Sequence, residues 1–313
     1  MRFISACLLL FWASPAAAHG GIEAWTSYAA WTADPFILVP LYALAILYLR
    51  GTRRIWRNAG FGRGTQPHQL GCFWAGWTIL AVALLSPLHL LSEQLLSVHM
   101  VEHELIMAVA APLLVLSRPL GTLLWAFPAN WRRPVALSIA PPLRPVLAIL
   151  TMPVIATVLH SLVIWAWHLP AMFDAALVKP WLHALQHASF LLSAVIFWWA
   201  ILNVPRAKMS TSAVHLFATM IAMTALGALI TLSPRLLYAV YHDRAEPYGL
   251  TSLGDQQLAG LIMWVPGCAI YAAAAICLLG FWLTAPLRVH VSFYLPTDNE
   301  LGRGRKKVWL DYH

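Results

Sequence analysis

Charged residues are scarce in this sequence. Asp, Glu, Lys and Arg make up only 10% of its 313 residues, whereas 60% of the residues are apolar. A water-soluble domain covers its surface with charge, so this balance excludes an ordinary soluble enzyme or binding module. The composition, with its 16 tryptophans, is typical instead of a protein that crosses a membrane several times.

Cysteine is also rare. Cys7 lies in a leader segment, Cys72 starts an apolar run, and Cys268 and Cys277 lie inside the last apolar run. None is expected on the outer side of the membrane, which excludes a disulfide framework there and argues against a relay of copper thiolates. The chain contains no phosphate-binding loop and no nucleophile motif, so we do not expect an enzyme.

The first 18 residues have the pattern of a secretory signal peptide. Arg2 precedes an apolar run over residues 3–13, and alanines occupy residues 16–18. The run is short for a membrane span of about 20 residues, although an uncleaved anchor helix is the alternative. Cleavage after Ala18 would leave His19 at the N-terminus, where its amine and imidazole would chelate copper(II).

Seven further apolar runs are each long enough, or nearly so, to cross a bilayer. They cover residues 34–50, 70–90, 98–117, 146–167, 181–202, 213–233 and 256–286. Pro266 is expected to kink the last run. We therefore predict an all-α polytopic bundle of seven transmembrane helices over residues 19–286, followed by a basic cytoplasmic tail over residues 287–313.

Basic residues predict the orientation of this bundle. If the mature N-terminus lies outside, sixteen of the twenty Lys and Arg residues fall in cytoplasmic segments, among them Arg50, Arg132 and Lys307. Cytoplasmic loops carry such an excess, so we expect the N-terminus outside and the C-terminus inside a bacterial inner membrane. The net charge of +8 then reflects topology rather than nucleic-acid binding, and the tail would contact anionic lipids.

Two segments share a histidine pattern. His99 and His103 are four residues apart with Glu102 before the second histidine, and residues 183–187 repeat this spacing as His-Ala-Leu-Gln-His. The spacing places both imidazoles of a pair on one helix face. Both segments are expected to run inward from the outer side, so the pairs lie at similar depth and could form one metal site.

The ligand types indicate which metal such a site would take. Imidazole suits copper, zinc, iron and nickel, while a thioether such as that of Met107 favours copper(I). Because protons compete for imidazole, binding is expected to weaken below a pH of about 6.5. The predicted ligands are His99, His103, His168, His183 and His187; additional ligands or residues that orient them are His19, His160, Glu102, Gln186, Met107 and Asp255.

Three separated stretches of the chain resemble one protein family. They are HMVEHELIMAVAAPLLVLSRPL at residues 99–120, WHLPAMFDAALVKPWLHALQHASFLLSAVIFWW at 167–199 and GLTSLGDQQLAGLIMWVPG at 249–267. In this order they resemble the seven-helix cytochrome c oxidase assembly factors of the CtaG type. The chain lacks the cysteine pair of the unrelated single-span copper chaperone that shares the family name.

The resemblance implies an inner-membrane protein that helps to build a haem-copper oxidase, with the oxidase subunits as partners, by supplying copper. The family's motif residues correspond here to the five predicted histidine ligands and to Asp255 with Gln256. Three alternatives stay open: a membrane cytochrome with bis-histidine haem, in which His160 would lie beneath His168, a copper transporter, and a metal-free scaffold. An inverted zinc peptidase is disfavoured, because Gln186 replaces the acid in the second motif.

Overall fold

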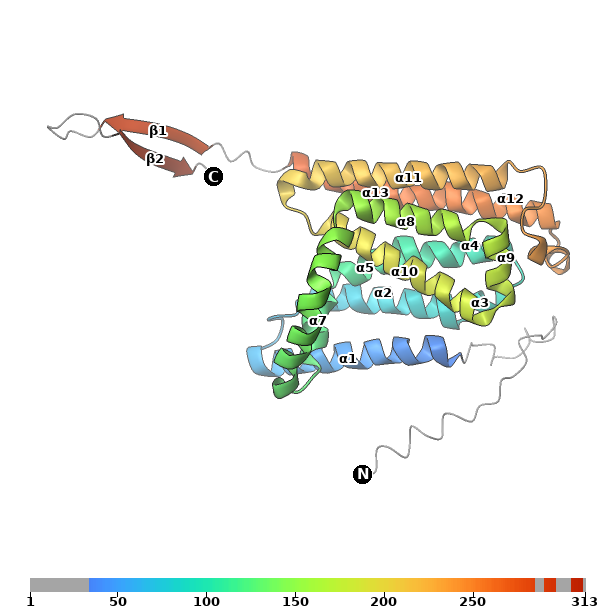
Figure 1. The fold of residues 1–313 in the computed structure, drawn as a ribbon, viewed down its shortest axis with the longest axis horizontal. Helices are drawn as coiled ribbons and strands as arrows, with labels where there is room; N and C mark the ends of the chain where they lie inside the picture. Colours follow the sequence, from blue (N-terminus) through green and yellow to red (C-terminus); the bar gives the residue numbers. More distant parts are fainter. Residues whose placement is uncertain (1–33, 285–289, 297–304, 312–313) are drawn as a thin grey trace, which may run out of the picture.

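The computed structural model describes residues 34–284, 290–296 and 305–311. The predicted signal peptide and His19 lie outside the described residues, as does part of the tail. Figure 1 shows long helices that run side by side, with one helix, α7 (Ala129–Leu150), crossing an end of the bundle.

The helices follow one another with short connections. The first half of the bundle consists of α1 (Pro35–Ala59), α2 (Pro67–Leu85), α3 (Pro87–Ser92), α4 (Leu96–Glu104), the π-helical turn η3 (Leu105–Ala110), α5 (Ala111–Leu116) and α6 (Pro119–Trp125). After α7 come α8 (Pro153–Trp167), α9 (Pro170–Val178), α10 (Pro180–Leu202), α11 (Met209–Thr231), α12 (Ser252–Ile262), the π-helical turn η7 (Met263–Gly267) and α13 (Cys268–Leu283). The 3₁₀ turns are η4 (Arg206–Lys208), η5 (Ala239–Tyr241) and η6 (Glu246–Tyr248).

Six helical segments of the described chain are long and apolar enough to cross a membrane. They are Pro35–Ala59, Pro67–Leu85, Leu96–Leu116, Pro180–Leu202, Arg206–Thr231 and Ser252–Leu283. The pair Leu143–Leu150 and Pro153–Trp167 is apolar enough to cross a membrane only if both helices are taken together, and they meet at a bend of 80°, so the described chain has six such spans, or seven if this pair counts as one. The predicted all-α polytopic bundle is therefore confirmed, with the fourth apolar run broken rather than continuous.

Prolines explain where many of these helices begin. Seven of them, α1, α2, α3, α6, α8, α9 and α10, have proline as their first residue. Proline lacks the N–H that would be unsatisfied in a first helical turn anyway, and its fixed φ suits that position. Pro153 thus separates α7 from α8, and Pro87 ends the second apolar run early by starting α3.

The third and last spans each contain a π-helical turn, η3 and η7 respectively. Such a turn adds a residue to the helix and rotates the side chains that follow it. In η7 the turn surrounds Pro266, the residue expected to kink this span. Residues on either side of these turns therefore do not lie on the same helix face as they would in a regular α-helix.

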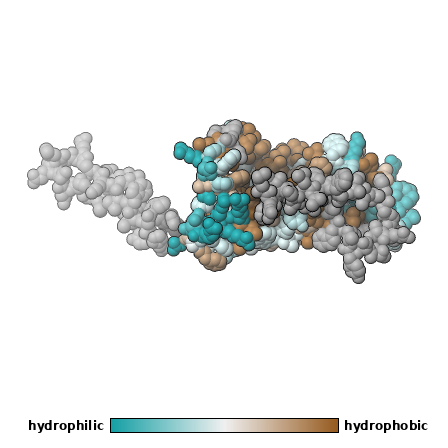
Figure 2. Space-filling view, turned by 90° about the horizontal axis from the view of Figure 1, so that it is seen from below, coloured by the Kyte–Doolittle hydropathy of each residue, from teal (hydrophilic) through white to brown (hydrophobic). Residues whose placement is uncertain are grey.

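The surface of the bundle is apolar, while many polar side chains lie inside. Figure 2 shows hydrophobic residues along the length of the molecule and hydrophilic ones gathered at its ends. Leu162, Ile221 and Ile276 are exposed by 62%, 52% and 69% although they lie within long helices. A surface of this kind is stable in hydrocarbon, so the chain is a multi-pass membrane protein.

The tail contributes the only strands in the described residues. Strands β1 (His290–Pro296) and β2 (Arg305–Asp311) pair antiparallel, with His290 opposite Asp311 and Pro296 opposite Arg305. This hairpin lies in the predicted tail, and the all-α prediction holds for the membrane part of the chain.

Candidate metal centre

Histidines from four segments gather near the end of the bundle where α3 and α9 lie (Figure 1). The ring centroids of His99 and His183 are 5.5 Å apart, and those of His103 and His187 are also 5.5 Å apart. The two predicted pairs meet because α10 packs beside η3 and α5, which continue the span that begins with α4. We call the following residues the histidine cluster: His89 on α3, His99 and His103 on α4, His168 at the end of α8, and His183 and His187 on α10.

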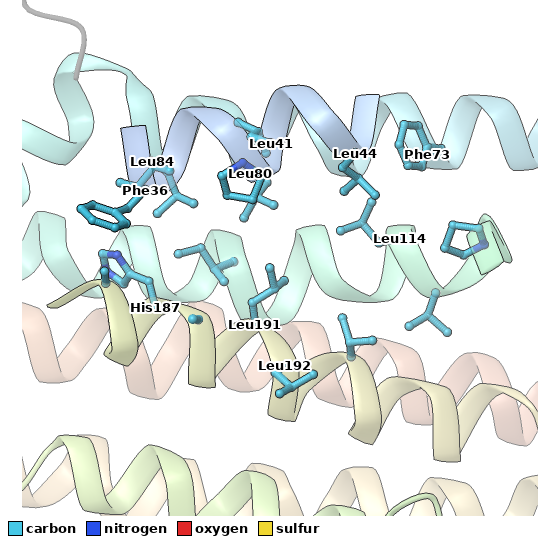
Figure 3. A pocket seen from close by; sticks show the side chains of 18 of the residues that line it. Phe36, Leu41, Leu44, Phe73, Leu80, Leu84, Leu114, His187, Leu191 and Leu192 are labelled. Atoms are coloured by element: carbon cyan, nitrogen blue, oxygen red, sulfur yellow. The ribbon is translucent and has the colours of Figure 1, made fainter. Parts of the chain in front are cut away.

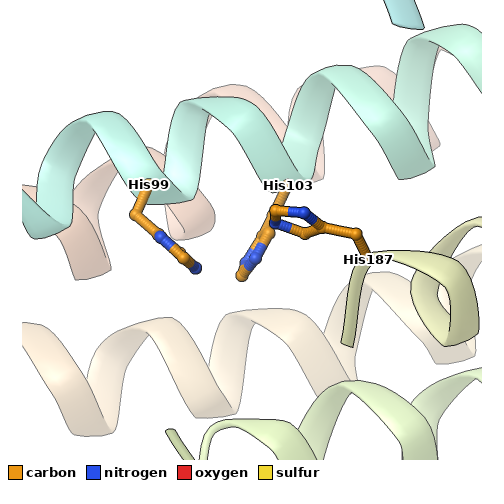
Figure 4. A group of neighbouring side chains, drawn as sticks. All are labelled: His99, His103 and His187. Carbon is orange, nitrogen blue, oxygen red and sulfur yellow. The ribbon is translucent and has the colours of Figure 1, made fainter. Parts of the chain in front are cut away.

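Donor atoms within the cluster are close enough to hold an ion. One nitrogen from each of His99, His103 and His187 lies within 4.8 Å of the others. Figure 4 shows these three side chains turned toward a common point between α4 and α10. All three residues are buried. The structure thus brings together three of the five histidines predicted as ligands.

Six of the twelve ring nitrogens in the cluster have no hydrogen-bond partner among the described residues. Within the described part of the chain, neither ring nitrogen of His99 or His103 is hydrogen bonded, and Nε2 of His183 and of His187 also lacks a partner. A buried polar atom without a partner costs about 1–3 kcal/mol. Six such atoms in one place would be destabilising, and a bound cation would remove much of that cost.

His89 is a member of the cluster that the sequence motifs missed. Its Nδ1 lies 2.7 Å from Oε1 of Glu102, and that same oxygen is 3.9 Å from Nε2 of His187. Burial opposes protonation of His89, but the charge and hydrogen bond of Glu102 outweigh it, so the pKa of His89 is raised above 6.5. The only sequence signal for His89 was its place at the outer end of the second apolar run.

His168 is held with one nitrogen on a backbone carbonyl and the other against a thioether. Its Nδ1 donates to the carbonyl oxygen of Ile164 at 2.7 Å, so Nε2 of the neutral ring carries the lone pair. That Nε2 lies 3.4 Å from Sδ of Met100. The hydroxyl of Tyr238 donates to the His168 carbonyl oxygen at 3.0 Å and fixes the backbone there. The ring is thus oriented as metal-binding histidines usually are.

Aromatic side chains hold the imidazoles in place. Phe173 lies 5.1 Å from the His99 ring, and Phe190 lies 4.5 Å from the His103 ring, measured between centroids. Both phenylalanines also contact the ring of His168 at 6.0 Å. These apolar walls exclude water and leave the nitrogens free, which strengthens any electrostatic interaction within the cluster.

The structure changes the interpretation of Met107. The prediction assumed that it extends the face of His99 and His103 by another four residues, but Met107 lies in η3, where the π-helical turn ends that periodicity. Met100 is the thioether beside a cluster imidazole. Gln186, by contrast, is buried on the cluster-bearing helix, and neither atom of its amide has a partner among the described residues.

Asp255 and Gln256 position other segments. Asp255 accepts hydrogen bonds from the backbone amides of Leu96 and Ser97 at 2.6 and 3.2 Å and from the Ser97 hydroxyl at 2.5 Å. It therefore caps the N-terminus of α4, whose own N-cap residue offers no side-chain acceptor. Gln256 accepts from the Leu237 amide at 2.6 Å and donates to the carbonyl oxygen of Arg235, which ties the preceding loop to α12.

His160 lies apart from the cluster, in a separate hydrogen-bonded network. Its Nδ1 is 3.0 Å from the Ser193 hydroxyl and its Nε2 is 3.3 Å from the Tyr271 hydroxyl. The ring also stacks on Phe197, with centroids 5.2 Å apart. Because both nitrogens are paired, the structure gives His160 a packing role and does not bring it together with His168.

Glu104 is a buried acid next to the cluster that contacts the last span. A Cβ at Gly267 would lie 2.7 Å from Oε1 of Glu104, so only glycine allows this close approach of the carboxylate to the backbone of η7. Glu104 therefore contacts η7, while Glu102, two residues earlier, lies at the cluster.

One side of the cluster borders an apolar groove. The cavity has a volume of 480 Å³ and is lined by α1, α2, α5 and α10, and His187 is its one titratable residue. Figure 3 shows His187 near one end of this groove, with Phe36 and Leu84 close by. The surroundings of His187 on this side resemble hydrocarbon, so water does not compete there for its nitrogen atoms.

One comparison with known proteins gives a match. A family model described as cytochrome c oxidase caa3 assembly factor, with the short name Caa3_CtaG, matches residues 46–285. No curated protein and no solved structure matches the chain. The match covers every helix of the histidine cluster and most of the chain.

Proposed function

We propose, starting from the fact that this chain belongs to the family of cytochrome c oxidase caa3 assembly factors, that it binds copper at the histidine cluster and hands it to the oxidase. The family establishes the role in oxidase assembly, which suggests a non-catalytic protein that associates with the oxidase. The observation that carries the copper proposal is the convergence of His99, His103 and His187, whose unpartnered nitrogens lie within 4.8 Å of one another.

The donor set favours copper over other cations. Neutral imidazole binds several transition metals, and a nearby thioether shifts the preference toward copper(I). Met100 supplies that thioether next to His168. Calcium and magnesium require oxygen ligands, and the group of His99, His103 and His187 contains no carboxylate. Copper is also the metal that a haem-copper oxidase needs.

The residues around the histidines support the binding of an ion rather than the conversion of a substrate. Glu102 carries a negative charge that offsets the charge of a cation in an apolar setting. Phe173 and Phe190 hold the rings, and the N-terminus of α4 is fixed by Asp255. Release would be ligand exchange, in which an oxidase subunit with better-matched ligands takes the ion from the histidines.

The packing of the rings supports a single ion rather than haem. The centroids of His99 and His103 are 4.2 Å apart with the rings edge to face, and those of His183 and His187 are 4.4 Å apart with the rings tilted, so the two rings of each pair are in direct contact. A bis-histidine haem needs two imidazoles on opposite faces of a large planar ring, whereas His187 is the one histidine of the described residues that lines the 480 Å³ cavity.

We further propose that the cluster faces the outside of a bacterial inner membrane. The basic end of α1, with Arg53, Arg54 and Arg57, lies at the opposite end of the bundle, beside α7 (Figure 1). Arg54 donates to the Ala126 carbonyl oxygen at 2.7 Å and anchors that end. Because basic residues favour the cytoplasmic side, the opposite end with the cluster would lie outside.

Metal analysis with an absorption spectrum tests the copper proposal. The protein would be purified in mild detergent beside a triple variant, His99→Ala, His103→Ala and His187→Ala, and a control, His242→Ala, at an exposed histidine outside the cluster. We expect about one tightly bound copper per wild-type and control chain, no Soret band, and loss of tight binding in the triple variant. Haem absorption lost in the variant, or no metal after copper reconstitution, would contradict the proposal.

A further inference from the structure

We propose that the histidine cluster contains a second, outer metal station formed by His89, Glu93 and His183, from which an ion passes inward in steps. This inference rests on the proposed copper function and adds a route for the ion. One donor atom from each of the three residues lies within 4.8 Å of the others, as at the inner station of His99, His103 and His187. Neither His89 nor Glu93 belongs to the histidine motifs.

A middle group of ligands connects the two stations. His89, Glu102 and His187 also have donor atoms within 4.8 Å of one another. This middle group shares His89 with the outer station and His187 with the inner one. An ion can therefore move inward while one imidazole stays bound at each step, which avoids releasing a bare cation into apolar surroundings.

Burial increases along this route. Glu93 is only half-buried, and His183 and His89 are exposed by 9% and 6%. Glu102 and His99 at the middle and inner groups are fully buried, and His103 is exposed by 1%. The outer station is thus the part of the cluster that an ion arriving from outside the bundle reaches first.

The outer station is held in a fixed geometry. The rings of His89 and His183 stack with centroids 5.4 Å apart and planes inclined by 14°. The Tyr241 hydroxyl donates to the carbonyl oxygen of Ser92 at 2.6 Å, and Nη1 of Arg244 donates to that of Glu93 at 2.6 Å. Both contacts tie the end of α3 to the loop before α12, so Glu93 is kept beside the two histidines.

The donor atoms also become softer from the outside inward. The outer and middle groups each contain one carboxylate, the inner station contains three imidazoles, and Met100 lies beside His168 next to the inner histidines. Softer ligands hold copper(I) more tightly, so the transfer from the middle group to the inner station would be favourable for that ion. The same order would retain copper(I) in preference to harder cations that the outer carboxylate admits.

Loading kinetics distinguish this route from a single site. Cu⁺ would be supplied as its bicinchoninate complex to the full-length protein in detergent, and the loss of absorbance of that complex would be followed with time. The variants are Glu93→Gln alone and Glu93→Gln with His183→Asn, with His242→Asn as the control at an exposed histidine. We expect the loading rate of the double variant, expressed per copper finally bound, to fall by about tenfold.

A complementary variant reports on the outer station itself. In His99→Asn with His103→Asn, we expect copper to be held weakly, with X-ray absorption showing an oxygen ligand from Glu93 or Glu102 that the wild-type site lacks. Loading of Glu93→Gln and of the double variant at the wild-type rate would overturn the outer station and leave the copper function intact. Absence of copper from wild-type protein would overturn both proposals, and Glu93→Gln alone serves if the double variant does not fold.

Discussion

Two groups of buried histidine lie within the same bundle and differ in their hydrogen bonds. His160 has a partner for each ring nitrogen, Ser193 on one side and Tyr271 on the other. His99 and His103 are equally buried, yet none of their four nitrogens is hydrogen bonded within the described residues. Burial and residue type are the same in both places, so neither identifies a metal ligand.

A buried imidazole nitrogen that lacks a hydrogen-bond partner is therefore the feature that indicates a metal ligand. A histidine paired with hydroxyl groups stabilises helix packing and gains nothing from a cation. Several neighbouring imidazoles whose nitrogens lack hydrogen-bond partners raise the free energy of the folded state, and a bound metal ion removes that cost. If this difference in hydrogen bonding governs both copper binding and stability, the variants described next should have effects that decrease in the order given.

The largest effect is expected at the centre of the cluster. His103→Asn removes a ligand of the inner station and should lower copper affinity by at least about a hundredfold, more than the ten- to hundredfold typical for residues behind the ligands. Competition with a copper(I) chelator would measure this. His160→Asn, the matched change in the paired network, should leave copper affinity within about threefold, and an equal loss in both variants would break the comparison.

Glu102→Gln should have the next largest effect on copper. The variant keeps the size of the side chain but removes the charge that lies 2.7 Å from His89 and 3.9 Å from His187. Loss of a carboxylate behind metal ligands costs about ten- to hundredfold in affinity. The same chelator competition measures it, and an unchanged affinity would show that Glu102 only positions His89.

His160→Leu should lower stability without affecting copper. Leucine fills much of the space but leaves the hydroxyls of Ser193 and Tyr271 without their partner, which costs about 1–3 kcal/mol. Thermal unfolding in detergent would show a lower Tm at unchanged copper content. His242→Leu, at an exposed position, is the control and should leave the Tm unchanged. A loss of copper in His160→Leu would instead bring His160 into the site.

The smallest effect is expected at the cap of α4. Asp255→Asn keeps an acceptor oxygen but removes the negative charge at the helix N-terminus, for a cost of about 0.5–1 kcal/mol in stability. Copper affinity should change by less than about threefold, because Asp255 acts on the backbone of α4 and not on the ion. A fall in affinity as large as that of Glu102→Gln would assign Asp255 to the cluster.

Local sequence periodicity was sufficient to predict much of the fold and part of the candidate site. Composition and apolar runs indicated a polytopic helical protein, and the four-residue spacing of His99 with His103 placed both rings on one face. These predictions hold because they depend on residues within one helix. The helical periodicity is interrupted by η3, which contains Met107, and at Pro153, where the fourth apolar run breaks into two helices.

Hydropathy and helical spacing are local properties, so the order of the amino acids is enough to predict a membrane-crossing chain with two matched histidine pairs. Which histidines share a site depends on how the helices pack. His89 joins the cluster, His160 pairs with Ser193 and Tyr271, and Asp255 caps a helix more than 150 residues away in the chain. The physical reason is that a donor nitrogen is free or satisfied according to what other helices place beside it, and packing between helices sets that.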